Sequence, residues 1–394
     1  MKNSSVKQNN RSDILLVIMA RQPVSRKQVS ELLEISPAAV TNIVDELISS
    51  GLVVHPDYPD SLYFYWLVVE GAFGEASARG GRRPIFLRIC EEAGLVLTAA
   101  FRLQNAWISV CNLMGKELFS RSYADFSFDG MPRLFQTLSA DTAQLIEQAG
   151  GRERFVGAGL SIPGTVENNR VLYSPELGLV DCDLAAVLQK ELQMPVYIDK
   201  DVYLNALGEN WMGAGWDYSD FVVVIIGTGI GSAIIINNRI YRGHCSMAGE
   251  IGYMITGRDA LENGPYTLTD FGYFEKTASL RTLKTQTSMP FHQIVSEAQA
   301  GNQELKNRIF ENADQICLGL GSVISLLNPQ AIILHGSYAA AEPLLADYMR
   351  ERLRNLTPVP CDVKFSKLGD RALRYGCVGN IWQKKHQMQF LPRH

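Results

Sequence analysis

"FVVVIIGTGIGSAIIINNRIYRG", residues 221 to 243, is the stretch that decides the fold. Apolar, β-branched runs flank a glycine-rich segment at residues 227–231, and this pattern predicts two strands joined by a tight turn. A third short run follows and extends the hairpin. The glycines suit two different structures: a turn whose backbone N–H groups approach phosphate, or a turn that needs a positive φ.

An earlier segment repeats this plan in "GLVLTAAF" and "AWISVCNLMGKEL", residues 94–101 and 106–118. Further strand patterns alternate with helical patterns at about residues 131–149, 184–193, 202–213, 303–327 and 342–355. This alternation predicts an α/β fold with a substantially buried sheet. A duplicated hairpin-plus-helices plan, with a cleft between the halves, is the two-lobed architecture of actin- and hexokinase-like ATPases, which have a ribonuclease H-like fold.

The first 90 residues predict a small helical module followed by strands. Three segments of helical period lie within residues 12–50, and a very short break separates the second from the third. Ser25 and Gln28 have the spacing of a capping box at the start of the second helix, and Ser36 can cap the third. This spacing is typical of a helix-turn-helix, whose recognition helix enters the major groove of DNA. A three-helix protein–protein module is the alternative.

The residues expected to face DNA lie near the start of the third helix. They are small or polar: Ser36, Ala38, Ala39, Thr41 and Asn42. Asn can pair with adenine, and Ala can contact the methyl group of thymine. Arg26 and Lys27, at the start of the preceding helix, are expected to hold phosphates.

A wing is expected after the three helices. "GLVV" at residues 51–54 starts a strand, and "ARGGRRPIFLRI" at residues 78–89 ends with another. Arg79, Arg82 and Arg83 are spaced by glycines and suit insertion into a narrow minor groove. A basic linker would have the same composition and is the alternative.

Composition excludes several classes of protein. The net charge of −4 and the pI of about 5.9 exclude a generic polyanion binder, so contacts with DNA must come from a local basic patch. The seven cysteines are scattered and form no CxxC pair, which indicates reduced thiols in the cytoplasm. No run reaches 18 apolar residues, so we expect no membrane span.

Four motifs follow the helical module in a fixed order. They are "GLSIPGTVENNRVLYSPELG" (159–178), "DKDVYLNALGE" (199–209), "GTGIGSAIIINNRIYRGHCSMAGEIGYM" (227–254) and "ILHGS" (333–337). With the helix-turn-helix and its "GGRRP" wing, the whole chain resembles a transcriptional regulator of the ROK family (repressors, open reading frames and sugar kinases).

The resemblance implies a division of the chain into domains. A winged helix-turn-helix DNA-binding domain with an extended wing would cover residues 1–90, and a sugar-kinase-like body would cover residues 91–394. The lobes of that body would be about residues 91–198 with the C-terminal helix, and about residues 199–380. Gly164, in the first of the four motifs, would lie at the ligand.

The resemblance also implies a nucleotide site, and here the chain departs from the family. The family's first hairpin reads Asp-x-Gly-x-Thr, but this chain has "AAFRLQN", with Ala100 at the Asp position and Arg102 at the glycine position. The second hairpin keeps the glycines at residues 227–231. Phosphoryl transfer depends on positioning and on metal-assisted charge stabilisation, so we do not expect the chain to be an enzyme.

Three carboxylates persist at the positions that the family uses for its catalytic base and for sugar hydroxyls. Asp201 stands at the base position, and Glu250 and Glu275 match the two glutamates that contact sugar. Their neutral partners have changed, because Lys200 replaces an Asn and Tyr253 replaces a His. Three convergent carboxylates repel one another, so a polyol, a cationic ligand or Lys200, which could pair with Asp201, must offset their charge.

The family's structural zinc site has lost its ligands in this chain. Its one histidine and three cysteines are replaced by Tyr253, Tyr266, Leu268 and Tyr273. No thiolate or imidazole remains to bind zinc at these positions. We therefore expect no metal, and we expect aromatic packing to hold the loop that zinc holds in relatives.

The sequence thus predicts a DNA-binding transcriptional regulator, a repressor in the cytoplasm. A sugar or sugar derivative in the kinase-like cleft would control it without phosphoryl transfer. Its partners would be a double-stranded DNA operator and the sugar effector, with no cofactor, and the chain would form a homodimer or a tetramer. Two alternatives remain: a sugar kinase with residual activity, and a regulator whose body binds a protein partner.

Overall fold

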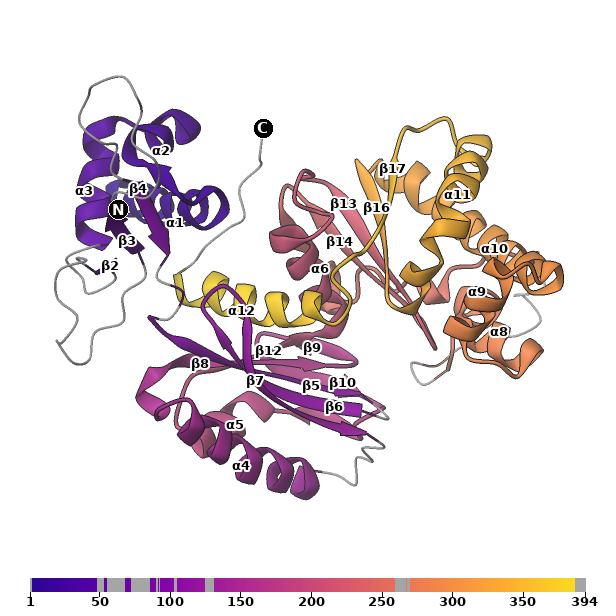
Figure 1. The fold of residues 1–394 in the computed structure, drawn as a ribbon, viewed down its shortest axis with the longest axis horizontal. Coiled ribbons are helices and arrows are strands. Elements are labelled where there is room, and N and C mark those ends of the chain that lie inside the picture. The colour runs from indigo at the N-terminus through magenta and orange to yellow at the C-terminus, as the bar shows by residue number, and fades with distance from the viewer. Residues whose placement is uncertain are drawn as a thin grey trace. The chain divides into compact units, whose positions relative to one another are not determined.

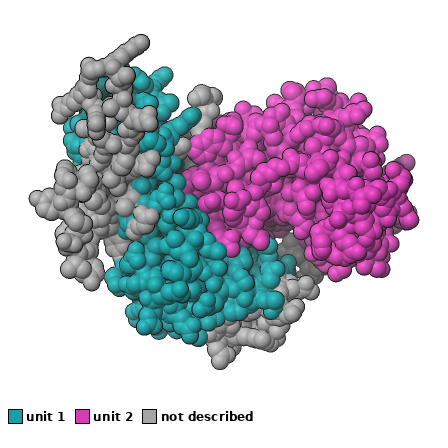
Figure 2. Space-filling view, in the orientation of Figure 1, with its two compact units in different colours: residues 1–199, 377–391 teal, residues 200–376, 392–394 magenta. Residues whose placement is uncertain are grey.

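The chain divides into two compact units, which Figure 2 shows in different colours. The computed structural model describes residues 2–47, 53–54, 68–71, 86–89, 91, 93–102, 105–124, 131–258, 267 and 270–386. Unit 1 comprises Met1–Asp199 and Cys377–Leu391, and unit 2 comprises Lys200–Gly376 and Pro392–His394. The expected division into domains and lobes remains a prediction.

The N-terminal part of unit 1 is the predicted helical module with a small sheet (Figure 1). Its helices are α1 (Lys2–Arg21), α2 (Arg26–Leu33) and α3 (Pro37–Leu47). Its strands are β1 (Val24–Ser25), β2 (Val53–Val54), β3 (Val68–Gly71) and β4 (Phe86–Ile89), in the order β1-β4-β3-β2. The strands expected at both ends of the wing are present, and β3 adds a strand between them.

Apolar periodicity and caps explain why α2 and α3 form where they do. The face of α3 predicted to be core is buried, since Val40, Ile43, Val44 and Leu47 are at most 4% exposed. The Ser25 side chain accepts a hydrogen bond from the Gln28 backbone N–H at 3.2 Å, and Gln28 Oε1 accepts one from the Ser25 N–H at 2.9 Å. This capping box is worth about 1 kcal/mol to the helix. Glu34 adopts a left-handed conformation, with φ of 53°, and so ends α2.

The rest of unit 1 is built on a five-stranded sheet of order β12-β8-β5-β6-β7 (Figure 1). The strands are β5 (Leu95–Arg102), β6 (Asn105–Asn112), β7 (Glu117–Ala124), β8 (Phe155–Ile162) and β12 (Val196–Lys200). β5, β6 and β7 pair antiparallel, whereas β5 and β8 pair parallel. Helices α4 (Met131–Gln148) and α5 (Leu184–Leu192) accompany this sheet, and β9 (Thr165–Glu167), β10 (Arg170–Ser174) and β11 (Leu179–Cys182) form a small second one.

Unit 2 repeats the plan with a five-stranded sheet of order β15-β14-β13-β16-β17. The strands are β13 (Phe221–Ile226), β14 (Ile230–Ile236), β15 (Arg239–Tyr241), β16 (Ala331–His335) and β17 (Asp362–Phe365). In both sheets the order is third, second, first, fourth and fifth strand, and in both the first two strands form an antiparallel hairpin. This repeat confirms the predicted duplicated, ribonuclease H-like fold.

Helices cover the sheet of unit 2 and complete its core (Figure 1). They are α6 (Asp201–Met212), α7 (Tyr273–Ala278), α8 (Leu280–Thr287), α9 (Phe291–Gln299), α10 (Gln303–Leu327) and α11 (Glu342–Leu356). α12 (Arg371–His386) crosses the boundary between the units. β16 is buried along its whole length, as a strand covered on both faces must be. Among the helices within the described ranges, none is long and apolar enough to span a bilayer.

Candidate functional site

The junction of β12 and α6 carries two of the residues expected at the ligand. Lys200 is the residue before α6, and Asp201 is its first residue. The Lys200 ammonium forms an ion pair with Glu250 Oε1, and the two side chains are 8% and 31% exposed. The Asp201 carboxylate accepts a hydrogen bond from the Val202 N–H at 2.8 Å and stabilises the first turn of α6. Lys200 thus offsets the charge of a site carboxylate, with a partner that the sequence analysis did not anticipate.

Tyr203 ties α6 to the loop that carries Glu250. Its ring is fully buried and lies 5.6 Å from Lys200 Nζ and 4.7 Å from Arg242 Cζ. Its hydroxyl lies 3.1 Å from the carbonyl oxygen of Ser246 and donates to it. Two cations on one ring and a buried hydrogen bond therefore hold this loop in place. Sequence reasoning missed this arrangement, although Lys200 and Tyr203 are only three residues apart in the sequence.

Glu275, on α7, supports the glycine-rich hairpin between β13 and β14. Its Oε1 accepts a hydrogen bond from the Ile230 N–H at 2.7 Å. A Cβ at Gly229 would lie 2.2 Å from that oxygen, so the close approach requires glycine. None of Gly227, Gly229 and Gly231, all within the described residues, has a positive φ. The interpretation of these glycines as a turn that needs positive φ is therefore wrong.

Burial raises the pKa of Glu275, and the nearby Glu250 carboxylate raises it further. Hydrogen bonds from the N–H groups of Ile230 and Gly272 oppose this shift. Glu275 also lines a cavity of about 410 Å³ beside α7 and α8, together with Phe271, Lys276, Ser279, Arg281, Thr282, Thr285 and Gln286. The lining does not include Lys200, Asp201 or Glu250.

Gly164 lies in the turn between β8 and β9 of unit 1. Its φ of +113° is strained for other residues, and a Cβ there would lie 2.2 Å from the Tyr173 carbonyl oxygen. The fold of this turn therefore requires glycine. Its expected role at the ligand remains a prediction.

The start of α3 presents the side chains that were expected to face DNA. Ser36 caps the helix, because its Oγ accepts the Ala39 N–H at 3.3 Å. Ser36, Ala38 and Asn42 are exposed, while Ala39 and Thr41 are half-buried. Contact of these five residues with DNA remains a prediction. Arg79, Arg82 and Arg83 lie outside the described residues.

The two basic residues at the start of α2 have different surroundings. Arg26 Nη1 donates to Asp45 Oδ1 at 2.8 Å and to the Thr41 carbonyl oxygen at 3.2 Å. The Lys27 side chain is 85% exposed, and its ammonium lies 3.7 Å from Glu31. Arg26 therefore contacts α3, whereas Lys27 is largely exposed, and the contact of either residue with phosphate remains a prediction.

A sequence model described as "ROK family" matches residues 130–385, which is most of the chain. The chain belongs to the ROK family. A model described as "MarR family" matches residues 8–61, over the N-terminal module.

Relatives among characterised proteins and solved structures agree with this assignment. The chain is 25% identical over 403 residues to a xylose repressor from Caldicellulosiruptor bescii, covering 95% of this chain and 96% of the repressor. It is 30% identical over 211 residues to a beta-glucoside kinase from Listeria monocytogenes, covering 48% of this chain and 67% of the kinase. A crystal structure of a ROK family transcriptional regulator, a homologue of the E. coli MLC protein, has the same fold: the TM-score is 0.76 at 21% identity, over 98% of this chain and 99% of that one.

The match to the repressor extends through the DNA-binding module, whereas the match to the kinase covers about half of the chain. The chain is therefore a DNA-binding transcriptional regulator of the ROK family. Its winged helix-turn-helix and its ROK body are both present in the structure.

In the ROK body, Tyr253 contacts the loop that carries Asp270. Its hydroxyl donates to the Asp270 carbonyl oxygen at 3.0 Å. Tyr273 is 8% exposed, and a Cβ at Gly272 would lie 2.2 Å from the Gly252 carbonyl oxygen, so the loop packs tightly here. Tyr266 and Leu268 lie outside the described residues. Over the described ranges, no group of three or more His, Cys, Asp or Glu side chains could hold a metal ion.

The first hairpin of the ROK body is formed by β5 and β6. Ala100 is 1% exposed and pairs with Trp107 across the hairpin, so an apolar side chain fills the position of the family's Asp. Arg102 ends β5 opposite Asn105, at the position of the family's glycine. The hairpin thus has the expected fold but lacks the carboxylate at the end of its first strand.

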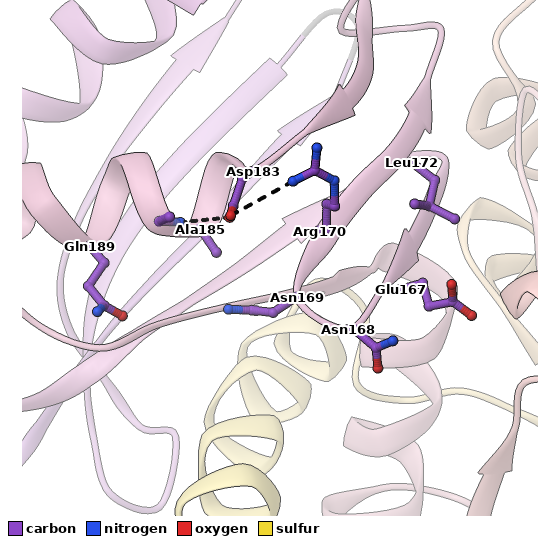
Figure 3. A pocket seen from close by; sticks show the side chains of 9 residues that line it. Glu167, Asn168, Asn169, Arg170, Leu172, Asp183, Ala185 and Gln189 are labelled. Atoms are coloured by element: carbon purple, nitrogen blue, oxygen red, sulfur yellow. Dashed lines mark hydrogen bonds and ion pairs between the residues drawn. The ribbon is translucent and has the colours of Figure 1, made fainter.

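A second cavity, of about 370 Å³, lies in unit 1 beside the β9–β10 turn and α5 (Figure 3). Arg170, at its edge, pairs with Asp181 at 2.7 Å and with Asp183 at 3.8 Å. The Asn169 side chain bonds the backbone of β12 at Val196 and Ile198 and fixes the turn. Sequence reasoning missed this cavity. Because Arg170 is paired with two carboxylates, we assign no anionic ligand to it.

Proposed function

We propose that this ROK regulator is a repressor whose body binds a sugar or sugar derivative through residues of unit 2. The observation that carries the proposal is the ion pair between Lys200 and Glu250. The ion pair places the Lys200 ammonium, a hydrogen-bond donor, beside carboxylate acceptors. The ammonium also balances part of the negative charge of the carboxylates. Sugar hydroxyls both donate and accept, so such a mixed set suits a neutral polyol.

Three further predicted ligand residues, Asp201, Tyr253 and Glu275, belong to the same unit, whereas Gly164 belongs to unit 1. Asp201 begins α6 beside Lys200, and Glu275 supports the glycine hairpin. Tyr253 stands three residues after Glu250 and anchors the neighbouring loop. We assign Asp201 and Glu275 to sugar hydroxyls and Tyr253 to the shape of the loop.

The proposal includes the absence of phosphoryl transfer. The family's Asp-x-Gly-x-Thr motif would place an Asp at Ala100 and a glycine at Arg102. Charge stabilisation of the transferred phosphoryl group would lack that carboxylate, and the Arg102 side chain would need to leave the space of the phosphates. We therefore expect sugar to act on this protein as an effector and not as a substrate.

DNA is the second partner in the proposal. The exposed start of α3 would read a major groove, and the arginines of the wing would enter the minor groove. A homodimer or tetramer would bind two half-sites related by two-fold symmetry, because each chain supplies one recognition helix. A repressor of chromosomal genes acts in the cytoplasm, so the proposal includes that location.

Thermal unfolding with added ligands tests the sugar site. A ligand that binds the folded state stabilises it by about 2.7 kcal/mol at 100 times its Kd. We expect one member of a panel of pentoses, hexoses, amino sugars and sugar phosphates to raise the Tm of the wild type. Glu250→Gln should remove that rise, whereas Glu311→Gln, at an exposed position on α10, should keep it.

A coupled assay for ADP, with ATP, Mg²⁺ and the same panel of sugars, tests the absence of phosphoryl transfer. Sugar-dependent production of ADP would contradict the proposal, as would a panel in which no compound changes the Tm.

A further inference from the structure

The recognition helix of this protein is acidic. α3 contains Asp45 and Glu46 but no lysine or arginine. Asp45 is exposed and lies seven residues after Ala38 and three after Asn42, on the face that is expected to enter the groove. A carboxylate on that face faces the negative potential of the DNA backbone, which opposes entry.

Arg26 compensates this carboxylate from the neighbouring helix. One guanidinium nitrogen donates both to the Asp45 carboxylate, at 2.8 Å, and to the Thr41 backbone carbonyl, at 3.2 Å. The Arg26 side chain is 23% exposed and the Asp45 side chain 60%. Arg26 follows Ser25, the N-cap residue of α2, so the start of α2 is fixed and the guanidinium contacts α3.

We propose that Arg26 is a positioning residue for DNA recognition, which acts through Asp45 and Thr41 rather than on a phosphate. It cancels the charge of Asp45 and holds α3 against α2, so that α3 can enter the groove. This role replaces the phosphate contact that the sequence suggested for Arg26. The inference rests on the binding of DNA by α3.

The two roles predict different dependences on salt. The logarithm of the binding constant for DNA falls linearly with the logarithm of the salt concentration. Each phosphate contact makes this slope steeper by about 0.9. If Arg26 is held by Asp45, removal of Asp45 frees a cation near DNA and steepens the slope. If Arg26 already binds a phosphate, removal of Asp45 leaves the slope unchanged.

The experiment uses the full-length chain and a duplex that the wild type selects from a pool of randomised DNA. Fluorescence anisotropy gives the affinity over a range of salt concentrations for Arg26→Ala, Asp45→Ala and the double variant. Lys27→Ala is the matched control, because Lys27 is the next residue on α2 and is largely exposed. Thermal unfolding of each variant checks that it folds.

We expect Arg26→Ala to weaken binding about tenfold with little change in slope, and the double variant to recover most of that loss. Asp45→Ala should bind at least as tightly as the wild type, with a slope steeper by about 0.9. Lys27→Ala should make the slope shallower by about 0.9, whether or not Asp45 is present.

Additive effects of Arg26→Ala and Asp45→Ala, or an unchanged slope in Asp45→Ala, would overturn the inference. The slope of Asp45→Ala decides the question even if Arg26→Ala does not fold. A wild type that selects no DNA would instead refute DNA binding itself, so the two failures are distinguishable.

Discussion

Substitution of Gly229 by alanine tests how the glycine hairpin is held. The new Cβ would lie 2.2 Å from Glu275 Oε1, far inside van der Waals contact, so the carboxylate must rotate away. That rotation removes the acceptor of the Ile230 N–H, on a residue that is 5% exposed. A buried N–H without an acceptor costs about 1–3 kcal/mol.

This loss corresponds to a decrease in Tm of roughly 2–12 °C for a domain of this size. Gly227→Ala is the matched control, because nothing lies within 4 Å of its Cβ position and its φ is not positive. We expect Gly227→Ala to leave the Tm unchanged or slightly raised. Differential scanning calorimetry measures both variants.

A double-mutant cycle assigns the loss to Glu275. In a Glu275→Ala background the acceptor is already absent, so Gly229→Ala should cost little more. Equal Tm values for Gly229→Ala and Gly227→Ala, or a full additional loss in the Glu275→Ala background, would refute this reasoning.

Three further predictions concern other positions. Tyr253→Phe removes the hydrogen bond to the Asp270 carbonyl and should lower stability by about 0.5–1.5 kcal/mol in urea unfolding, whereas an unchanged midpoint would show that the hydroxyl is dispensable. Burial raises the pKa of Glu209 above its ordinary 4.5. The free energy of unfolding should therefore fall as the pH rises from 4.5 through the raised pKa. Denaturation at a series of pH values measures this fall, and Glu209→Gln should flatten it. Burial raises the pKa of Cys361 to about 11, whereas Cys245 is exposed. At neutral pH, iodoacetamide should therefore alkylate Cys245 long before Cys361, as followed by mass spectrometry. The reverse order would contradict the burial of Cys361.

Much of the fold could be predicted from the sequence because its signals are local. The apolar runs of β13 and β14, the period of α3 and the capping box at Ser25 depend on neighbours within a few residues. The helices α7 to α9 and the small sheet of β9 to β11 were not predicted. Residues 273–299 break into three short helices, and the strands β9 to β11 have three to five residues each, too short for a clear period.

The site was predicted in its residue types but not in its partners. The positions of Lys200 and Glu250 followed from motifs, yet their ion pair joins residues that are 50 apart in sequence. The pairing of Arg26 with Asp45 spans 19 residues and two helices. The interpretation of the hairpin glycines as a turn that needs positive φ was wrong, and the close approach of Glu275 to Gly229 is a tertiary contact of which their spacing carries no sign. Such contacts between distant residues depend on how helices and strands pack, which local sequence patterns do not encode.

The most direct test of a sugar-controlled repressor is the affinity of the wild type for its selected DNA duplex with each sugar of the panel, at one fixed salt concentration. Typical coupling between two ligands changes an affinity about 5–150-fold. We predict that one sugar changes the Kd for DNA within this range and that Glu250→Gln abolishes the change while still binding DNA. A Kd that no sugar alters, for a protein that binds its duplex tightly, would contradict the account.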